Sequence, residues 1–104
     1  MPQGPIRIQA VPASFSALNV TAAKVLKATP GSIGRVVVNT AGTAGDLTIN
    51  DCATTGAAAA SNEILKVPYG SLTDGQVIDL NFPCKTGITI SAITTGGVVA
   101  VAYS

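Results

Sequence analysis

The chain contains no histidine and no tryptophan, and few of its residues carry a charge. Without histidine it lacks the side chain that most often acts as a general base near neutral pH, and no Ser-His or Cys-His pair can form. Charged residues make up 11% of the 104 positions, whereas about a quarter is usual. A surface this poor in charge opposes association only weakly, which indicates that part of it is covered in the working state.

The basic residues are too scattered to form a nucleic-acid-binding surface. Such a surface needs a basic stripe or an aromatic stacking platform, and the net charge here is only +1. No apolar run approaches the roughly 20 residues of a membrane span, and the N-terminal stretch has no apolar run long enough for a secretory signal. We therefore expect no nucleic-acid partner, no membrane association and synthesis in the cytoplasm. The six bases are Arg7, Lys24, Lys27, Arg35, Lys66 and Lys85.

Short runs of alternating apolar and polar residues dominate the chain, and Gly, Pro, Asn and Asp separate them. About eight or nine such runs, spaced roughly 8–12 residues apart, are typical of an antiparallel sandwich or barrel. The sequence therefore predicts an all-β fold, an antiparallel β-sandwich that is jelly-roll-like. The expected strands are 17–20, 23–29, 32–40, 46–51, 63–70 ending at Pro68, 77–82 ended by Pro83, 87–94 and 98–104, with a short edge strand at 6–11.

Two segments also contain helix-forming residues. The segment 17–29 is rich in Ala, Leu and Lys, but Thr, Val and Asn interrupt any helical pattern, so two short strands fit better than a helix. The Ala-rich segment 52–62 is bounded by Gly56 and by Ser61-Asn62, too closely for more than one helical turn. We expect a surface loop there.

The ends of the chain differ in character. Residues 1–15 are expected to form an N-terminal arm, because Pro2, Pro5 and Pro12 exclude a central strand. Residues 16–104 are expected to form a single sandwich domain. Its last strand should be tied into a sheet, and an unpaired edge on that strand favours docking or self-pairing.

The stretch 30–52 is predicted to be a β-hairpin, because two alternating runs flank a short Gly-bearing loop at 41–45. Arg35 and Asn39 mark the outer face of the first run, and Ile33 shares that face by alternation. The inward positions predict a core made of Val, Ile and Leu. The core candidates are Val36, Val38, Leu47, Ile49, Ile64, Val77, Leu80, Ile88, Ile90, Val99 and Val101.

Cys52 and Cys84 are the only cysteines. One interpretation is a disulfide that closes a loop of roughly thirty residues and stabilises the fold by about 3–4 kcal/mol. We favour two free thiols, because cytoplasmic proteins rarely carry structural disulfides. Two cysteines without histidine do not complete a metal site, so we expect no bound metal.

The five acidic residues form no recognisable catalytic pair. Asp46, Asp51 and Asp74 lie in or beside turns, where Asp typically bonds its own backbone. Glu63 and Asp79 occupy outward strand positions. We therefore do not expect the paired carboxylates of a glycosidase.

The remaining candidate motifs are also explained by turns. Asp46, Asn50 and Asp51 do not have the spacing of a Ca²⁺-binding loop. "PGSIG" and "GTAG" lack the Lys-Ser/Thr ending and following helix of a phosphate-binding loop. Tyr69 is either an interface anchor or an aromatic cap over the core. We therefore expect no catalytic, cofactor-binding or metal-ligating residues, and no enzyme.

The layout of residues 20–104 nevertheless resembles a known class. Its recurring pieces are "KVLKATPG", an Ala-rich insert followed by "NEILKVP", "LNFPCKTGI" and a closing "VVAVAYS". In this arrangement of strands and turns the chain resembles the small virion structural proteins of tailed bacteriophages, which decorate or cement the head. No catalytic residue is carried over with this resemblance.

The resemblance implies a multi-copy, non-enzymatic virion component that is made in the bacterial host cytoplasm and binds the lattice of the major capsid protein. A low-charge surface rich in Val, Ala and Thr fits that role, as does an arm that could order on a neighbouring subunit. Homo-oligomers, dimers or trimers, are expected. The alternative is a receptor- or glycan-binding module on a head or tail fibre, against which stands the scarcity of aromatic residues. A hydrolase is disfavoured by the missing histidine.

Overall fold

The structure, a computed structural model, describes residues 15–104. The edge strand expected at 6–11 and all but the last residue of the expected arm lie outside the described residues. Within the described range the chain forms eight strands and three short 3₁₀ turns. They are β1 (Phe15–Val20), β2 (Lys24–Lys27), β3 (Gly31–Thr40), β4 (Asp46–Asn50), η1 (Thr55–Ala57), η2 (Ala60–Asn62), β5 (Glu63–Pro68), η3 (Tyr69–Ser71), β6 (Val77–Cys84), β7 (Ile88–Ala92) and β8 (Val98–Tyr103).

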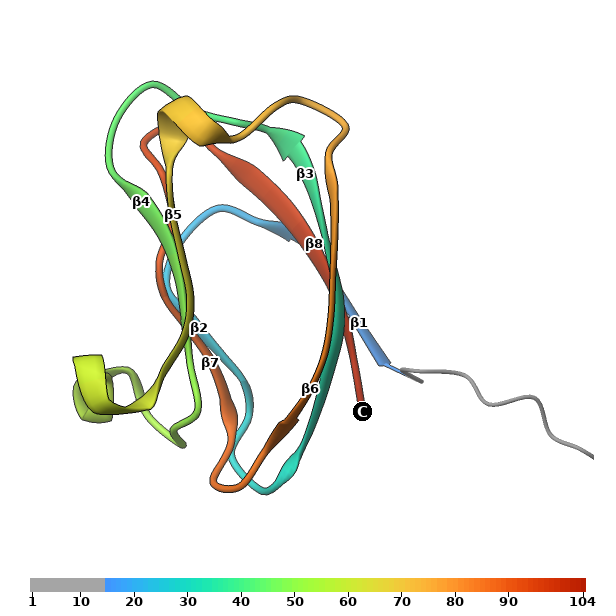
Figure 1. Cartoon of the computed structure of the whole chain (residues 1–104), viewed down its shortest axis with the longest axis vertical. Coiled ribbons are helices and arrows are strands. Elements are labelled where there is room, and N and C mark those ends of the chain that lie inside the picture. The colour runs from blue at the N-terminus through green and yellow to red at the C-terminus, as the bar shows by residue number, and fades with distance from the viewer. Residues whose placement is uncertain (1–14) are drawn as a thin grey trace, which may run out of the picture.

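The strands form two four-stranded antiparallel sheets that face each other as a sandwich (Figure 1). One sheet has the order β1-β8-β3-β6 and the other β2-β7-β4-β5. The first strand pairs with the last, the second with the second last, and so on toward the middle of the chain. The pairs are β1 with β8, β2 with β7, β3 with β6 and β4 with β5. The β3–β8 and β4–β7 pairs then join these four ribbons into sheets. This is a long hairpin rolled up on itself, the arrangement of an eight-stranded jelly roll.

The eight strands predicted between residues 17 and 104 are thereby confirmed, and segment 17–29 forms strands β1 and β2 rather than a helix. The predicted hairpin at 30–52 is wrong, because β3 and β4 belong to different sheets. The loop 41–45 instead crosses from one layer to the other. It is held by hydrogen bonds to the β7–β8 turn, from the Thr43 amide to the Thr95 carbonyl (2.9 Å) and from the Thr95 amide to the Ala44 carbonyl (2.8 Å).

The core lies between the sheets and consists mainly of aliphatic side chains. Eight of the predicted core residues are 0–2% exposed, and Ile64 and Leu80 are half-buried against them. The eight are Val36, Val38, Leu47, Ile49, Ile88, Ile90, Val99 and Val101.

Two predictions about facing are wrong, and strand register explains both. Val77 is 51% exposed, because Val36 pairs with Ile78, which places Ile78 rather than Val77 on the inner face. Ile33 is fully buried although Arg35, two positions on, is exposed. A β-bulge between them shifts the register against both neighbouring strands, and such a bulge reverses the alternation of faces.

Two further predictions, about the end of β6 and the edge of β8 in the β1-β8-β3-β6 sheet, are wrong. Pro83 does not end its strand, since β6 continues to Cys84. A proline is tolerated there because β6 is an edge strand with one neighbour. The terminal strand β8 has no unpaired edge, because it lies between β1 and β3. Self-pairing through β8 is therefore excluded as a route to oligomers.

Candidate functional site

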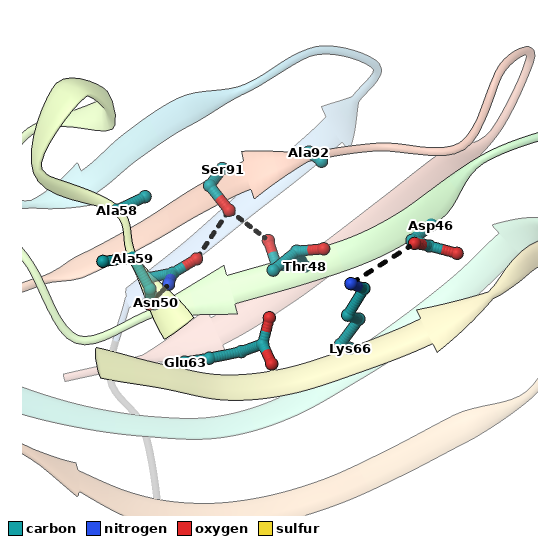
Figure 2. Close-up of a pocket in the computed structure, with 9 residues that line it drawn as sticks. All are labelled: Asp46, Thr48, Asn50, Ala58, Ala59, Glu63, Lys66, Ser91 and Ala92. Atoms are coloured by element: carbon teal, nitrogen blue, oxygen red, sulfur yellow. Dashed lines mark hydrogen bonds and ion pairs between the residues drawn. The ribbon is translucent and has the colours of Figure 1, made fainter. Parts of the chain in front are cut away.

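A shallow pocket of about 290 Å³ lies on the outer face of the β2-β7-β4-β5 sheet. Strands β4, β5 and β7 form its floor and one side, and the loop between β4 and β5 forms the opposite wall (Figure 2). Alternation along β4 turns its polar residues outward here, while Leu47 and Ile49 enter the core. The lining residues are Asp46, Thr48, Asn50, Ala58, Ala59, Glu63, Lys66, Ser91 and Ala92.

Asn50 fixes the floor of this pocket. Its side chain is on the outer face of the sheet yet only 2% of the residue is exposed, because the β4–β5 loop covers it. The amide nitrogen donates to the Ala59 carbonyl (3.0 Å) and to the Asn62 side-chain oxygen (2.8 Å), and the amide oxygen accepts from the Ser91 hydroxyl (2.5 Å). With both hydrogens and the oxygen engaged, this amide supports the loop and is not free for a ligand.

Asn62 completes the support from within the loop. Its oxygen also accepts from the Ala59 amide (3.0 Å), and its nitrogen donates to the Ala57 carbonyl (3.0 Å). The Ala-rich segment, predicted to be a loop with at most one helical turn, therefore holds two 3₁₀ turns in a defined shape. The pairing of these two asparagines was not predicted from the sequence. The available signal was Asn on either side of a low-complexity loop, since Asn amides readily bond nearby backbone.

Charged and hydroxyl groups form the rim. The Lys66 ammonium lies 3.9 Å from the Asp46 carboxylate, so Asp46 pairs across strands instead of bonding its own backbone as predicted. Glu63 is exposed, as predicted, and its carboxylate reaches from β5 toward β4 (Figure 2). Within residues 15–104 no hydrogen bond or ion pair engages the Glu63 carboxylate or the Thr48 hydroxyl. These two groups are open to a ligand.

Asp51, next to the buried Asn50, serves a different purpose. Its carboxylate accepts hydrogen bonds from the amides of Lys85 (2.9 Å), Thr86 (2.8 Å) and Gly87 (3.1 Å) in the β6–β7 turn. Burial raises the pKa of the Asp51 carboxyl, but the three amides and the Lys85 charge together outweigh it, so this pKa lies below its usual value. Asp51 therefore joins two loops.

The aspartates lie in or beside turns, as predicted. The prediction that they bond their own backbone is wrong, because their partners belong to other segments. Asp74 likewise bonds a distant loop, accepting from the Ala41 amide (2.8 Å). Asp46, Asn50 and Asp51 point to the rim, the floor and another loop respectively, so the structure does not bring them together as ligands. The segment "PGSIG" is mostly the start of β3, and Tyr69 is 46% exposed in η3 and does not cap the core.

Both cysteines are buried and free, which confirms the favoured prediction. The Cys52 thiol donates to the Thr54 carbonyl (3.2 Å), and the Cys84 thiol to the Phe82 carbonyl (3.8 Å). Burial, with a smaller effect of the Asp51 charge, raises the pKa of Cys84 to about 11. A thiol with so high a pKa is a poor nucleophile at neutral pH.

Over the described residues, no three His, Cys, Asp or Glu side chains are grouped closely enough to hold a metal ion. None of the helical segments between residues 15 and 104 is long and apolar enough to span a bilayer. Comparisons of the chain with family models, curated proteins and solved structures give no match. The function of the protein is therefore inferred from its fold and from the surfaces described above.

Proposed function

We propose that this chain is a non-enzymatic structural protein of a tailed-bacteriophage virion, a capsid decoration or cement protein that binds the lattice of the major capsid protein. The observation that carries the proposal is the strand order β1-β8-β3-β6 over β2-β7-β4-β5. Jelly rolls of this kind recur in viral capsid proteins. Because one fold hosts many functions, the surface must support the same role.

The outer face of the β1-β8-β3-β6 sheet supports it. Val37 pairs with Ala100 on one side and with Val77 on the other, which sets three apolar residues in a row across the sheet. Leu18 follows inward Ala17 on the neighbouring strand β1, where the register with β8 shifts, and is 73% exposed. We call Leu18, Val37, Val77 and Ala100 the apolar row. Leu18 and Val77 are exposed and Val37 and Ala100 are half-buried, and exposed apolar side chains on a sheet face favour contact with another protein surface.

The charged residues beside the apolar row also permit docking. The ion pair between Arg35 and Asp79 (2.8 Å) lies beside the apolar row and neutralises itself. Docking of a protein surface over the row therefore does not bury an unpaired charge, which would oppose binding. A multi-copy protein of this kind is made in the host cytoplasm and works in the virion, as a dimer or trimer on the lattice.

Quantitative mass spectrometry of purified virions tests the proposal. We expect the protein in many copies per particle, in a fixed ratio to the major capsid protein. Its absence from particles, or its presence at about one copy per particle, would contradict lattice binding. Electron microscopy of the same particles then distinguishes the head from the tail or a fibre.

A second candidate is a receptor- or glycan-binding module on a head or tail fibre. The pocket between β4, β5 and β7 favours it, because the Glu63 carboxylate and the Thr48 hydroxyl are open to a polar ligand. A fibre position in the particle map, together with low copy number, would support this candidate over the lattice role.

A further inference from the structure

We propose that the pocket on the outer face of the β2-β7-β4-β5 sheet binds a neutral saccharide ring. The ring would lie with its hydroxyls against Glu63, Thr48 and Lys66 and with its C–H groups against the methyl groups of the loop wall. This inference does not depend on lattice binding, since the pocket and the apolar row are on opposite faces of the sandwich.

The size of the pocket limits how large a bound ligand can be. Its volume of about 290 Å³ is just below the range of small-molecule sites, which typically span about 300–1,000 Å³. One sugar ring fits such a volume, whereas a longer segment would extend onto the flat part of the sheet. The pocket is also open to solvent, so a ring at the end or the side of a glycan chain can enter it.

The charged groups on the rim of the pocket limit the charge that a bound ligand can carry. A carboxylate only accepts hydrogen bonds and an ammonium only donates them. Lys66 is paired with Asp46, so a simple anion meets the unpaired Glu63 carboxylate, and a simple cation meets one exposed carboxylate, fewer oxygen ligands than a hard cation requires. Sugar hydroxyls both donate and accept, so one ring can satisfy Glu63 and Lys66 at the same time. A neutral polyhydroxylated ligand therefore matches the rim better than an ion of either sign.

The wall supplies an apolar contact for the rest of the ring. Ala58 and Ala59 from the loop and Ala92 from β7 place methyl groups around the polar groups. Asn50 and Asn62 hold that wall in position through the hydrogen bonds described above. A preformed wall lowers the entropy cost of binding. Because the lining contains no aromatic residue, we expect a millimolar dissociation constant.

The test is a titration of the ¹⁵N-labelled full-length protein, followed by the amide chemical shifts of β4, β5, β7 and the β4–β5 loop. The probes are methyl α-glucopyranoside, methyl α-galactopyranoside and methyl α-mannopyranoside, with ethylammonium and inorganic phosphate as ionic probes. We expect saturable shifts around the pocket with at least one glycoside, and none of that pattern with the two ions.

Two variants and two matched controls assign the binding to the pocket. Ala58→Leu fills the pocket and should abolish the shifts, whereas Ala60→Leu, exposed in the same loop but outside the lining, should leave them unchanged. Glu63→Ala removes an acceptor from an exposed position and should weaken binding about tenfold. Asp79→Ala removes an exposed carboxylate from the other sheet and should have no effect.

Several outcomes would overturn the proposal. These are the absence of saturable shifts with all three glycosides, equal shifts with an ionic probe, or binding that is as strong in Ala58→Leu and in Glu63→Ala as in the parent protein. Because Glu63 is on the surface, its variant keeps the test decisive even if Ala58→Leu disturbs the loop. Particle content is measured separately, so the failure of saccharide binding leaves the lattice role standing, and the reverse also holds.

Discussion

The carboxylate of Asp51 and the amide of Thr86 are joined by a hydrogen bond of 2.8 Å, although they belong to loops far apart in the sequence. The amides of Lys85 and Gly87 donate to the same carboxylate. One side chain thus ties the β4–β5 loop to the β6–β7 turn at one end of the sandwich. Hydrogen bonds from backbone amides to a charged acceptor are the stronger kind.

Replacing this carboxylate should lower stability and change its dependence on pH. Asp51→Asn keeps the size of the side chain but removes the charge, and we expect a loss of about 1–3 kcal/mol at pH 7. The pKa of Asp51 in the folded state lies below the usual 3.8. Its contribution is therefore complete above the unfolded pKa and is lost as the pH falls through the folded value.

Urea denaturation at pH 7 and below pH 3 measures both effects. The free energy of unfolding of the two proteins should differ at pH 7 and converge at acid pH. Asp79→Asn serves as the control, because that carboxylate forms an exposed ion pair with Arg35 and such pairs contribute little. A difference between Asp51→Asn and the parent that stays constant across this pH range would contradict the assignment.

Removing the amide of Asn50 should loosen the wall of the pocket. In Asn50→Ala the Ala59 carbonyl, the Asn62 oxygen and the Ser91 hydroxyl each lose a partner. Buried polar groups without partners are costly, so we expect a loss of about 1–3 kcal/mol and faster amide hydrogen exchange in the β4–β5 loop. The exposed Asn39→Ala is the control. Unchanged exchange in the loop would show that other contacts hold it.

Alternation of residue types was enough to predict the all-β class and most of the core. Val36 and Val38, for example, follow a two-residue period without interruption between them. It failed at Ile33 and Val77, because a β-bulge and a pairing register depend on the partner strand and not on the strand's own residues. It also failed at the 41–45 loop, since a short Gly-bearing loop can close a hairpin or cross between sheets with the same residues.

The candidate site was less predictable than the core. Glu63 could be placed outward from its strand, but nothing local indicated that Lys66, Thr48 and the loop methyl groups would surround one pocket. That arrangement follows from the pairing of β4 with β5 and β7, which is a long-range property. Alternation along β4 turns Asn50 to the outer face, and only the fold of the covering loop buries it.

The thiols of Cys52 and Cys84 should not react with labelling reagents in the native protein. Both are buried and unpaired with each other, and the raised pKa of Cys84 keeps that thiol protonated at neutral pH. We expect no thiol labelling of the native protein, two labels after denaturation, and the same melting temperature with and without reductant. A melting temperature that falls by several degrees in reductant would point to a disulfide instead.

Charge introduced into the apolar row should separate docking from folding. Leu18 and Val77 are 73% and 51% exposed, so the double variant Leu18→Lys, Val77→Lys should change the free energy of unfolding by less than about 1 kcal/mol. If the row contacts the capsid lattice, burying two unpaired ammonium groups there should reduce occupancy on virions at least about tenfold. Occupancy is measured as the ratio of this protein to the major capsid protein.

Tyr69→Lys is the matched control for that experiment, because Tyr69 is a comparably exposed hydrophobic residue in η3, away from the row. It adds the same type of charge without touching the row and should leave occupancy unchanged. Equal losses in both variants would indicate a general effect of positive charge. Full occupancy of the double variant, with the fold intact by circular dichroism, would mean that the protein docks through another surface, because a lattice contact across this row cannot accommodate two buried lysines without a partner charge.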